Sequence, residues 1–124
     1  MNNKSRTNPI NWNKRNYQFV ADGIMHSCRL LDKQPVELTN AEKTNTSKEI
    51  RIQMGLPKYK EMAIMRIINT VCSNQTDAYF AKGPPGLVVH IRDRHYIRTL
   101  LVAEGFNQFY KEKENAKSKE KDND

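Results

Sequence analysis

The 124-residue sequence has little cysteine and no long apolar run, and each scarcity excludes a class of protein. Cys28 and Cys72 are the only cysteines, too few for a disulfide framework. No stretch approaches the ~20 consecutive apolar residues that a transmembrane helix needs. The first 16 residues lack the apolar core of a signal peptide. We therefore expect a soluble protein with no membrane partner, in a reducing intracellular compartment such as the cytoplasm or the nucleus.

The sequence also lacks the motifs of common enzymes and metal sites. It contains no G-x-S-x-G, P-loop or paired-carboxylate signature. A single residue separates His26 from Cys28, whereas two to four residues usually separate paired zinc ligands. No second paired motif accompanies them. Asp93, His95 and Cys72 match no known catalytic arrangement. We therefore predict that the protein is not an enzyme, and the sequence indicates no cofactor, metal or small-molecule substrate.

Basic charge is abundant, and it lies ahead of the C-terminal tail. The chain has 21 Lys and Arg against 14 Asp and Glu, a net charge of +7. Residues 111–124 hold five lysines and five acidic residues, so the remaining 16 basic and 9 acidic residues place the whole excess in 1–110. Such a balance favours a polyanionic partner, either nucleic acid or an acidic protein surface. Solubility alone would also account for it.

Composition divides the chain into three parts. Residues 1–13 are rich in asparagine and lack periodicity, which indicates a flexible basic arm, with Trp12 available to anchor it on the core. Residues 14–110 are expected to form a single globular domain. Residues 111–124 are low-complexity Lys, Glu, Asn and Asp, and we expect a disordered charged tail.

Apolar spacing and helix-end signals predict three helices in the first half of the domain. The first runs from Lys14 to Lys33 and ends before Pro35. A capping-box spacing at Thr46 and Glu49 predicts a short second helix to Met54. Gly55 and Pro57 then make a tight turn into a third helix, 57–72, whose wide apolar arc must be buried.

The segment 76–98 predicts a β-hairpin followed by a final helix. Residues 77–81 and 87–92 are short strand-like runs, and the loop between them, Lys82-Gly83-Pro84-Pro85-Gly86, has turn chemistry. Asp93 can cap the last helix. Helix, short helix, tight turn, helix, β-hairpin and C-terminal helix is the order of an α+β, mostly helical, winged helix-turn-helix-like fold. An ordinary α+β core is the alternative.

In the winged-helix interpretation, eight side chains contact nucleic acid. Asparagine and arginine on the third helix can pair with base edges, while basic residues of the hairpin and the next helix meet phosphates. The expected set is Lys58, Lys60, Arg66, Asn69, Lys82, Arg92, Arg94 and Arg98. This predicts a small non-enzymatic regulator that binds nucleic acid, with duplex DNA favoured over RNA as the partner. The alternative is that these charges are merely solvated.

The aromatic residues before the tail support a second hypothesis. Phe106, Phe109 and Tyr110 follow Gly105 and either continue the last helix or form an added strand. Together with the basic charge they would let the protein act as an adaptor or inhibitor that binds an acidic partner protein, or form a homodimer through this C-terminal segment.

Overall fold

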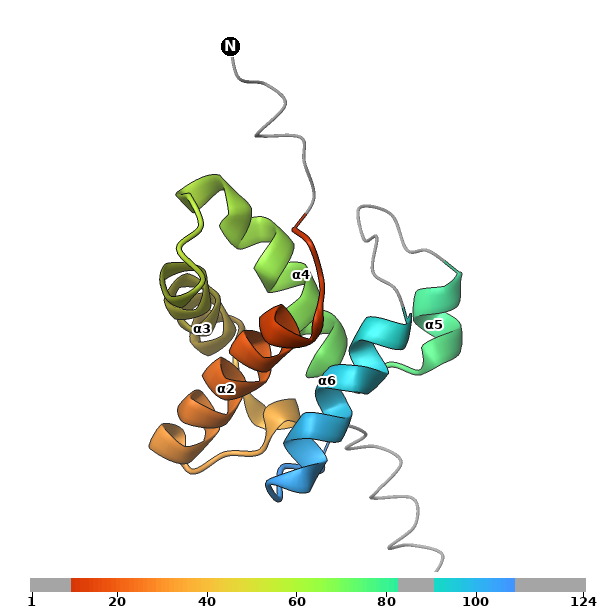
Figure 1. The fold of residues 1–124 in the computed structure, drawn as a ribbon. Coiled ribbons are helices and arrows are strands. Elements are labelled where there is room, and N and C mark those ends of the chain that lie inside the picture. The colour runs from red at the N-terminus through yellow and green to blue at the C-terminus, as the bar shows by residue number, and fades with distance from the viewer. Residues whose placement is uncertain (1–9, 83–90, 109–124) are drawn as a thin grey trace, which may run out of the picture.

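The computed structural model describes residues 10–82 and 91–108, and every regular element in those ranges is a helix (Figure 1). Their order is α2 (Lys14–Leu31), η1 (Pro35–Glu37), α3 (Asn40–Gln53), η2 (Lys58–Lys60), α4 (Glu61–Val71), α5 (Asp77–Ala81) and α6 (Ile91–Ala103). The prediction of a mostly helical protein is therefore confirmed.

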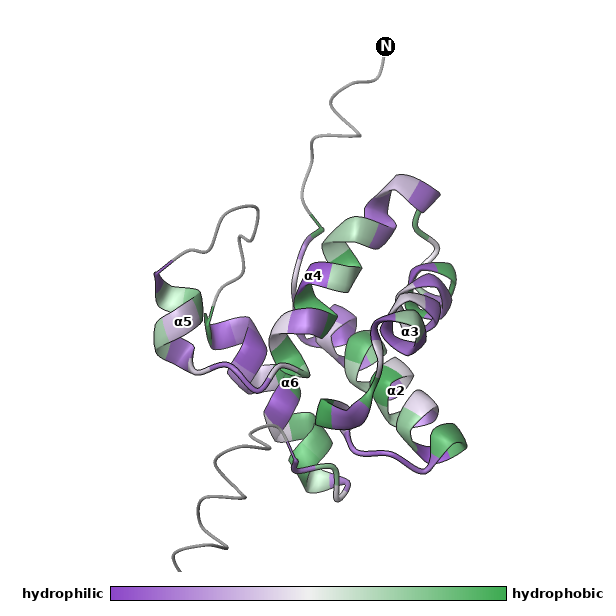
Figure 2. Ribbon diagram, turned by 180° about the vertical axis from the view of Figure 1, so that it is seen from behind, coloured by the Kyte–Doolittle hydropathy of each residue, from purple (hydrophilic) through white to green (hydrophobic). Residues whose placement is uncertain are grey.

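Helix α2 is the central element of the fold. In Figure 1 it crosses the front of the molecule, with α4 behind it, α3 on one side and α6 on the other. Apolar residues from α2, α4 and α6, with Ile50 of α3, are buried in one core, which includes Val20, Ile24, Ile64 and Ile97. The long helices alternate hydrophobic and hydrophilic residues along their length, as helices with one buried side do (Figure 2).

The predicted β-hairpin, and with it the winged α+β fold, is wrong. Residues 77–81 form the short helix α5, because the Thr76 hydroxyl caps it by accepting from the Tyr79 amide at 3.4 Å. Ile91 and Arg92, assigned to the second strand, are the first residues of α6. The described ranges contain no strand. The Pro-Pro loop and residues 87–90 lie outside those ranges.

Helix α3 begins seven residues earlier than predicted, since its N-cap is Thr39 and not Thr46. Its capping box is Thr39 with Glu42: the Thr39 hydroxyl accepts from the Glu42 amide at 3.1 Å, and the Glu42 carboxylate accepts from the Thr39 amide at 2.8 Å. Thr46, which was expected to be the cap, is buried within the helix. Its hydroxyl donates to the Glu42 carbonyl at 2.8 Å and lies 2.5 Å from the Ser27 hydroxyl of α2.

The tight turn between α3 and α4 forms as predicted. Gly55 has a φ of 70°, the left-handed conformation that ends a helix at low cost for glycine. Pro57 then precedes the single 3₁₀ turn η2, so the α-helical part of the third helix starts at Glu61. Ile64, Ile67 and Ile68 are buried, which confirms the apolar arc.

Both ends of the described chain pack on the core. Ile10 is buried, and the Trp12 ring stacks on Tyr17 with centroids 5.9 Å apart, as the anchoring role predicted. At the other end Gly105, with a φ of 91°, terminates α6. Phe106 packs against the core, and the Gln108 carbonyl accepts from the Val36 amide at 3.1 Å. Residues 1–9, Phe109, Tyr110 and the predicted tail lie outside the described ranges.

Candidate nucleic-acid interface

Helix α4 exposes a stripe that includes the predicted site residues Arg66 and Asn69. Arg66 is exposed, and Asn69 and Ser73, which follows the end of the helix, are half-buried. Thr70 is buried, and its hydroxyl donates to the Arg66 carbonyl at 2.8 Å. Met62, four residues before Arg66 and 66% exposed, extends the stripe toward the start of the helix.

Two lysines precede this stripe in η2. Lys58 is exposed, and the Lys60 ammonium lies 5.8 Å from the centre of the Tyr59 ring. The only carboxylate between residues 58 and 75 is Glu61, which accepts from Arg51 Nε at 2.5 Å. Residues 58–73, which we call the basic segment, thus contain Lys58, Lys60 and Arg66 and a single acidic residue, Glu61, whose carboxylate is paired with Arg51.

Arg94 and Arg98, which were expected to meet phosphates, are not on the surface. Arg94 is fully buried, and Arg98 is 6% exposed. Arg94 Nε donates to the Thr70 carbonyl at 2.8 Å, and Arg98 Nε donates to the Val71 carbonyl at 2.9 Å. These carbonyls end α4, where the helix dipole is negative, so both guanidinium groups act as a cap.

The same two arginines also hold the loop after α4. Arg98 Nη2 donates to the Ser73 carbonyl at 2.8 Å, and Arg94 Nη2 donates to the Gln75 carbonyl. Arg94 Nη1 forms an ion pair with Asp77 and its guanidinium carbon lies 4.7 Å from the centre of the Phe80 ring. These contacts fix α5 and the end of α4 on α6, a structural role rather than a phosphate-binding one.

Asp77 joins this network to the surface. Its Oδ2 shares a hydrogen bond of 2.6 Å with His95 Nε2, while its Oδ1 accepts from Arg94. Burial acts to raise the pKa of Asp77, but the hydrogen bond and charge of His95, together with the Arg94 guanidinium, hold it below its ordinary value. Asp77 therefore stays ionised and compensates the local positive charge.

Lys82 and Arg92 are both exposed. Lys82 follows α5, Arg92 is the second residue of α6, and the two lie on either side of segment 83–90, which is outside the described ranges.

Asp93, next to Arg92, does not cap α6: it lies in the first turn, is buried, and accepts a hydrogen bond from the Tyr17 hydroxyl. Burial and this hydrogen bond raise the pKa of Tyr17 to about 12.

Of the predicted partner-binding aromatics, the structure describes Phe106. Its ring is half-buried against the core and lies 5.2 Å from the guanidinium carbon of Arg29. Arg29 Nη2 in turn lies 3.5 Å from Glu104 Oε1. Phe106 thus contributes to the fold, and the adaptor hypothesis rests on Phe109 and Tyr110, outside the described ranges.

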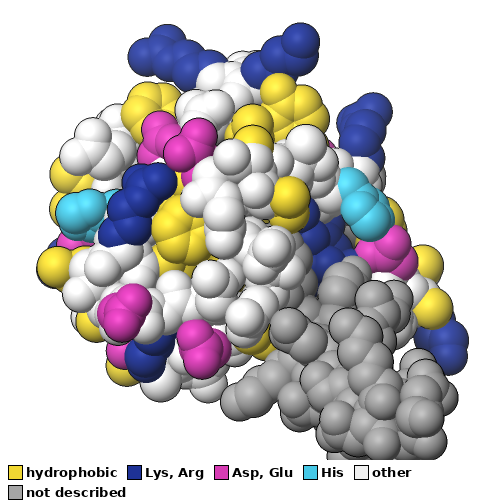
Figure 3. Space-filling model, turned by 90° about the horizontal axis from the view of Figure 1, so that it is seen from below, with side chains coloured by type: hydrophobic (Ala, Val, Ile, Leu, Met, Phe, Trp, Pro, Cys, Tyr) yellow, Lys and Arg dark blue, Asp and Glu magenta, His cyan; other side chains and the backbone are white. Residues whose placement is uncertain are grey.

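The end of the molecule that is lowest in Figure 1 does not offer a uniform charge. On this face Lys and Arg side chains are interspersed with Asp, Glu and His among the described residues (Figure 3). Mixed charge of this kind gives little net attraction for a polyanion.

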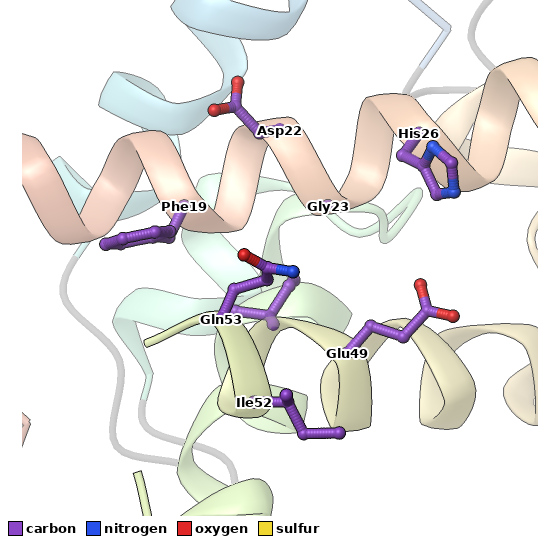
Figure 4. A pocket seen from close by; sticks show the side chains of 8 residues that line it. Phe19, Asp22, Gly23, His26, Glu49, Ile52 and Gln53 are labelled. Carbon is purple, nitrogen blue, oxygen red and sulfur yellow. The ribbon is translucent and has the colours of Figure 1, made fainter. Parts of the chain in front are cut away.

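A groove of 540 Å³ between α2 and α3 is also unsuited to a polyanion. Phe19, Gly23 and His26 of α2 face Glu49, Ile52 and Gln53 of α3 across it (Figure 4). Its titratable lining is Asp22, His26 and Glu49, so it has two carboxylates and no lysine or arginine.

The two cysteines are buried, free thiols. Burial raises the pKa of Cys28 to about 11 and that of Cys72 to about 12. The described residues hold no cluster of three or more His, Cys, Asp or Glu side chains arranged for a metal ion. Their helices include none with both the length and the hydropathy of a membrane span.

The thiols should therefore resist modification. At pH 8 we expect Cys28 and Cys72 to react with a disulfide reagent at least about a hundredfold more slowly than free cysteine, because only the thiolate attacks. The same protein in denaturant is the control, and both thiols should then react at the free rate. A thiol that reacts at the free rate in the native protein would contradict the described burial.

One polar pocket was missed by sequence reasoning. Asn40 and Lys43 of α3, Asn69 of α4 and Tyr79 of α5 line a cavity of 490 Å³. No local pattern marks it, because three helices and the loop after α4 supply its walls.

The predicted site residues fall into three groups. Lys58, Lys60, Arg66 and Asn69 lie close together in the sequence. Lys82 and Arg92 are exposed but distant from them in the sequence, and Arg94 and Arg98 are buried.

No family model matches the chain, and no match was found among curated proteins or among solved structures.

Proposed function

We propose that the protein binds nucleic acid, without catalysing a reaction, through the basic segment 58–73. The observation that carries this proposal is the concentration of Lys58, Lys60 and Arg66 next to a single acidic residue, Glu61, whose carboxylate is paired with Arg51. Phosphates would contact these cations, and the half-buried side chains of Asn69 and Ser73 offer hydrogen-bonding groups beside them. A hairpin wing has no part in this proposal, and neither do Arg94 and Arg98.

The net charge of +7 supports the proposal at long range. A positively charged protein gathers polyanions from solution, and short-range contacts then decide where they dock. Lys82 and Arg92, which are exposed, add to this general attraction. Contacts of this kind are insensitive to base sequence, so the protein should bind mixed-sequence oligonucleotides.

Fluorescence anisotropy with labelled single strands and duplexes tests the proposal. We expect Arg66→Gln to weaken binding by about three- to tenfold, the equivalent of ~1 kcal/mol for one phosphate contact. Arg29→Gln is the matched control, because it removes the same charge from an exposed arginine in the last turn of α2. We expect it to leave the affinity within about twofold of the unmodified protein's, because Arg29 makes no phosphate contact in the proposal.

Two results would contradict the proposal. The first is no detectable binding to any oligonucleotide at low salt, where phosphate contacts are strongest. The second is an equal loss of affinity in Arg66→Gln and Arg29→Gln, which would mean that overall charge, and not the basic segment, governs binding.

A further inference from the structure

The pocket at the end of α4 has the volume of a ligand site and a mainly polar lining. Its 490 Å³ volume falls in the range of small-molecule pockets, and it opens between the start of α3, the end of α4, the following loop and α5. We call it the amide pocket, because four side-chain amides line it together with one lysine and one exposed tyrosine: Asn40, Asn69, Asn74, Gln75, Lys43 and Tyr79.

The amides have hydrogen-bonding capacity to spare. Within the described ranges, no hydrogen bond joins the side-chain amides of Asn40, Asn69, Asn74 or Gln75 to another residue. Each amide offers two donor hydrogens and an acceptor oxygen. That combination matches the edge of a nucleobase, which asparagine and glutamine recognise by paired hydrogen bonds.

The rest of the lining also fits a base. The Tyr79 ring is 43% exposed and is set edge-on to Phe80, with centroids 5.1 Å apart, so a flat ring can stack on it. Lys43 is the only charged residue of the lining. An uncharged aromatic ring attached to a phosphate therefore suits this pocket. The groove between α2 and α3 would repel the phosphate of such a ligand, because two carboxylates line it.

The amide pocket is continuous with the basic segment. Asn69 and Ser73 belong both to the exposed stripe of α4 and to the pocket lining. Arg66 precedes Asn69 by three residues, so it lies on the same side of the helix and about 4.5 Å nearer to the start of the helix along its axis. A strand whose phosphate contacts Arg66 would thus have its next bases within reach of the amides.

We propose that the amide pocket receives an unpaired base of a nucleic-acid strand that lies along α4. This inference rests on the proposed function and adds to it the form of the ligand. A base that is paired and stacked in a duplex cannot enter a pocket without being extruded, which costs a few kcal/mol. The protein therefore prefers single strands to duplexes of the same length.

The test compares a single-stranded oligonucleotide of about eight nucleotides with a strand of equal length built from abasic sites. The two carry the same phosphate charge, so they differ in the bases alone. We expect Tyr79→Ala to weaken binding of the base-containing strand by about fivefold or more and to leave the abasic strand unchanged. Tyr79→Phe keeps the ring and should retain the affinity.

Asparagine variants give a second, independent readout. Asn69→Ala should weaken binding of the base-containing strand only, whereas Asn45→Ala, a change at an exposed asparagine of α3 outside the pocket, should have no effect. Circular dichroism confirms that each variant is folded, as the partial exposure of Tyr79 and Asn69 leads us to expect.

The outcomes separate this inference from the function on which it rests. No binding of either strand by the unmodified protein would remove both. Binding with equal effects of Tyr79→Ala on the two strands, or with no effect on either, would overturn the pocket and leave the basic segment. A nucleoside monophosphate that binds more tightly than the oligonucleotide would show that the pocket serves a free nucleotide, which overturns the strand proposal.

Discussion

Replacing Arg94 with methionine should lower the free energy of unfolding by about 3 to 5 kcal/mol. Methionine has a similar length, so the core stays filled, but the Thr70 carbonyl and the Gln75 carbonyl lose a donor and Asp77 keeps only His95. The Thr70 carbonyl is buried, and a buried acceptor without a donor keeps its desolvation cost. Since whole domains are stable by about 5 to 15 kcal/mol, this one change would remove much of the stability.

Urea unfolding followed by circular dichroism measures the effect. Arg92→Met is the matched control on the same helix: Arg92 is exposed, so its replacement should change stability by no more than about 0.5 kcal/mol. If Arg94→Met does not fold, Arg94→Lys, which keeps the charge and loses the forked donors, should be folded and still clearly destabilised. Equal stability of Arg94→Met and Arg92→Met would show that Arg94 does not cap α4.

Gly23→Ala should destabilise the protein although alanine is the better helix former. A Cβ added at Gly23 would lie 2.7 Å from Ile50 Cδ1 and closer still to Ile50 Cγ1. Ile50 is 1% exposed and has little room to move. Overpacking of this kind costs about 1 to 3 kcal/mol, which outweighs the ~1 kcal/mol that alanine gains over glycine within a helix. Glycine at this position lets α2 and α3 approach closely.

A double-mutant cycle gives the sharper result, because the sign of the effect should reverse. Ile50→Ala removes Cγ1 and Cδ1 and should cost about 2 to 5 kcal/mol by itself. In that background the new methyl of Gly23→Ala meets empty space, so the second change should stabilise the protein by about 1 kcal/mol. Additive effects in the two backgrounds, measured by urea unfolding, would mean that the two residues are not in contact.

Local chemistry allowed several elements to be predicted from the sequence. Periodic apolar residues identified α2 and α4, and Gly55 followed by Pro57 identified the turn before α4, because these signals need no knowledge of distant residues. The hairpin prediction failed because it depended on the Pro-Pro loop. Thr76-Asp77 is itself a helix start, and its capping geometry determines the conformation of residues 77–81.

The buried arginines show how composition can mislead where spacing does not. Arg94 and Arg98 were grouped with Arg92 as a surface charge run. Their positions relative to Ile97 and Leu101, however, follow three- and four-residue steps and place all four on one side of α6. That side faces the core. The acceptors that bind the two guanidinium groups are carbonyls at the C-terminal end of α4, and the sequence of α6 alone does not indicate them. The amide pocket had no comparable signal, since its walls are distant in sequence.

The salt dependence of single-strand binding tests the central claim most directly. For each phosphate contact, the slope of log affinity against log salt concentration should be about 0.7 for a single strand. The account predicts that the double variant Lys58→Gln, Arg66→Gln has a slope smaller in magnitude by about 0.7 for each contact that it loses, while Arg29→Gln keeps the slope of the unmodified protein. An unchanged slope in the double variant would contradict the claim that nucleic acid lies along residues 58–73.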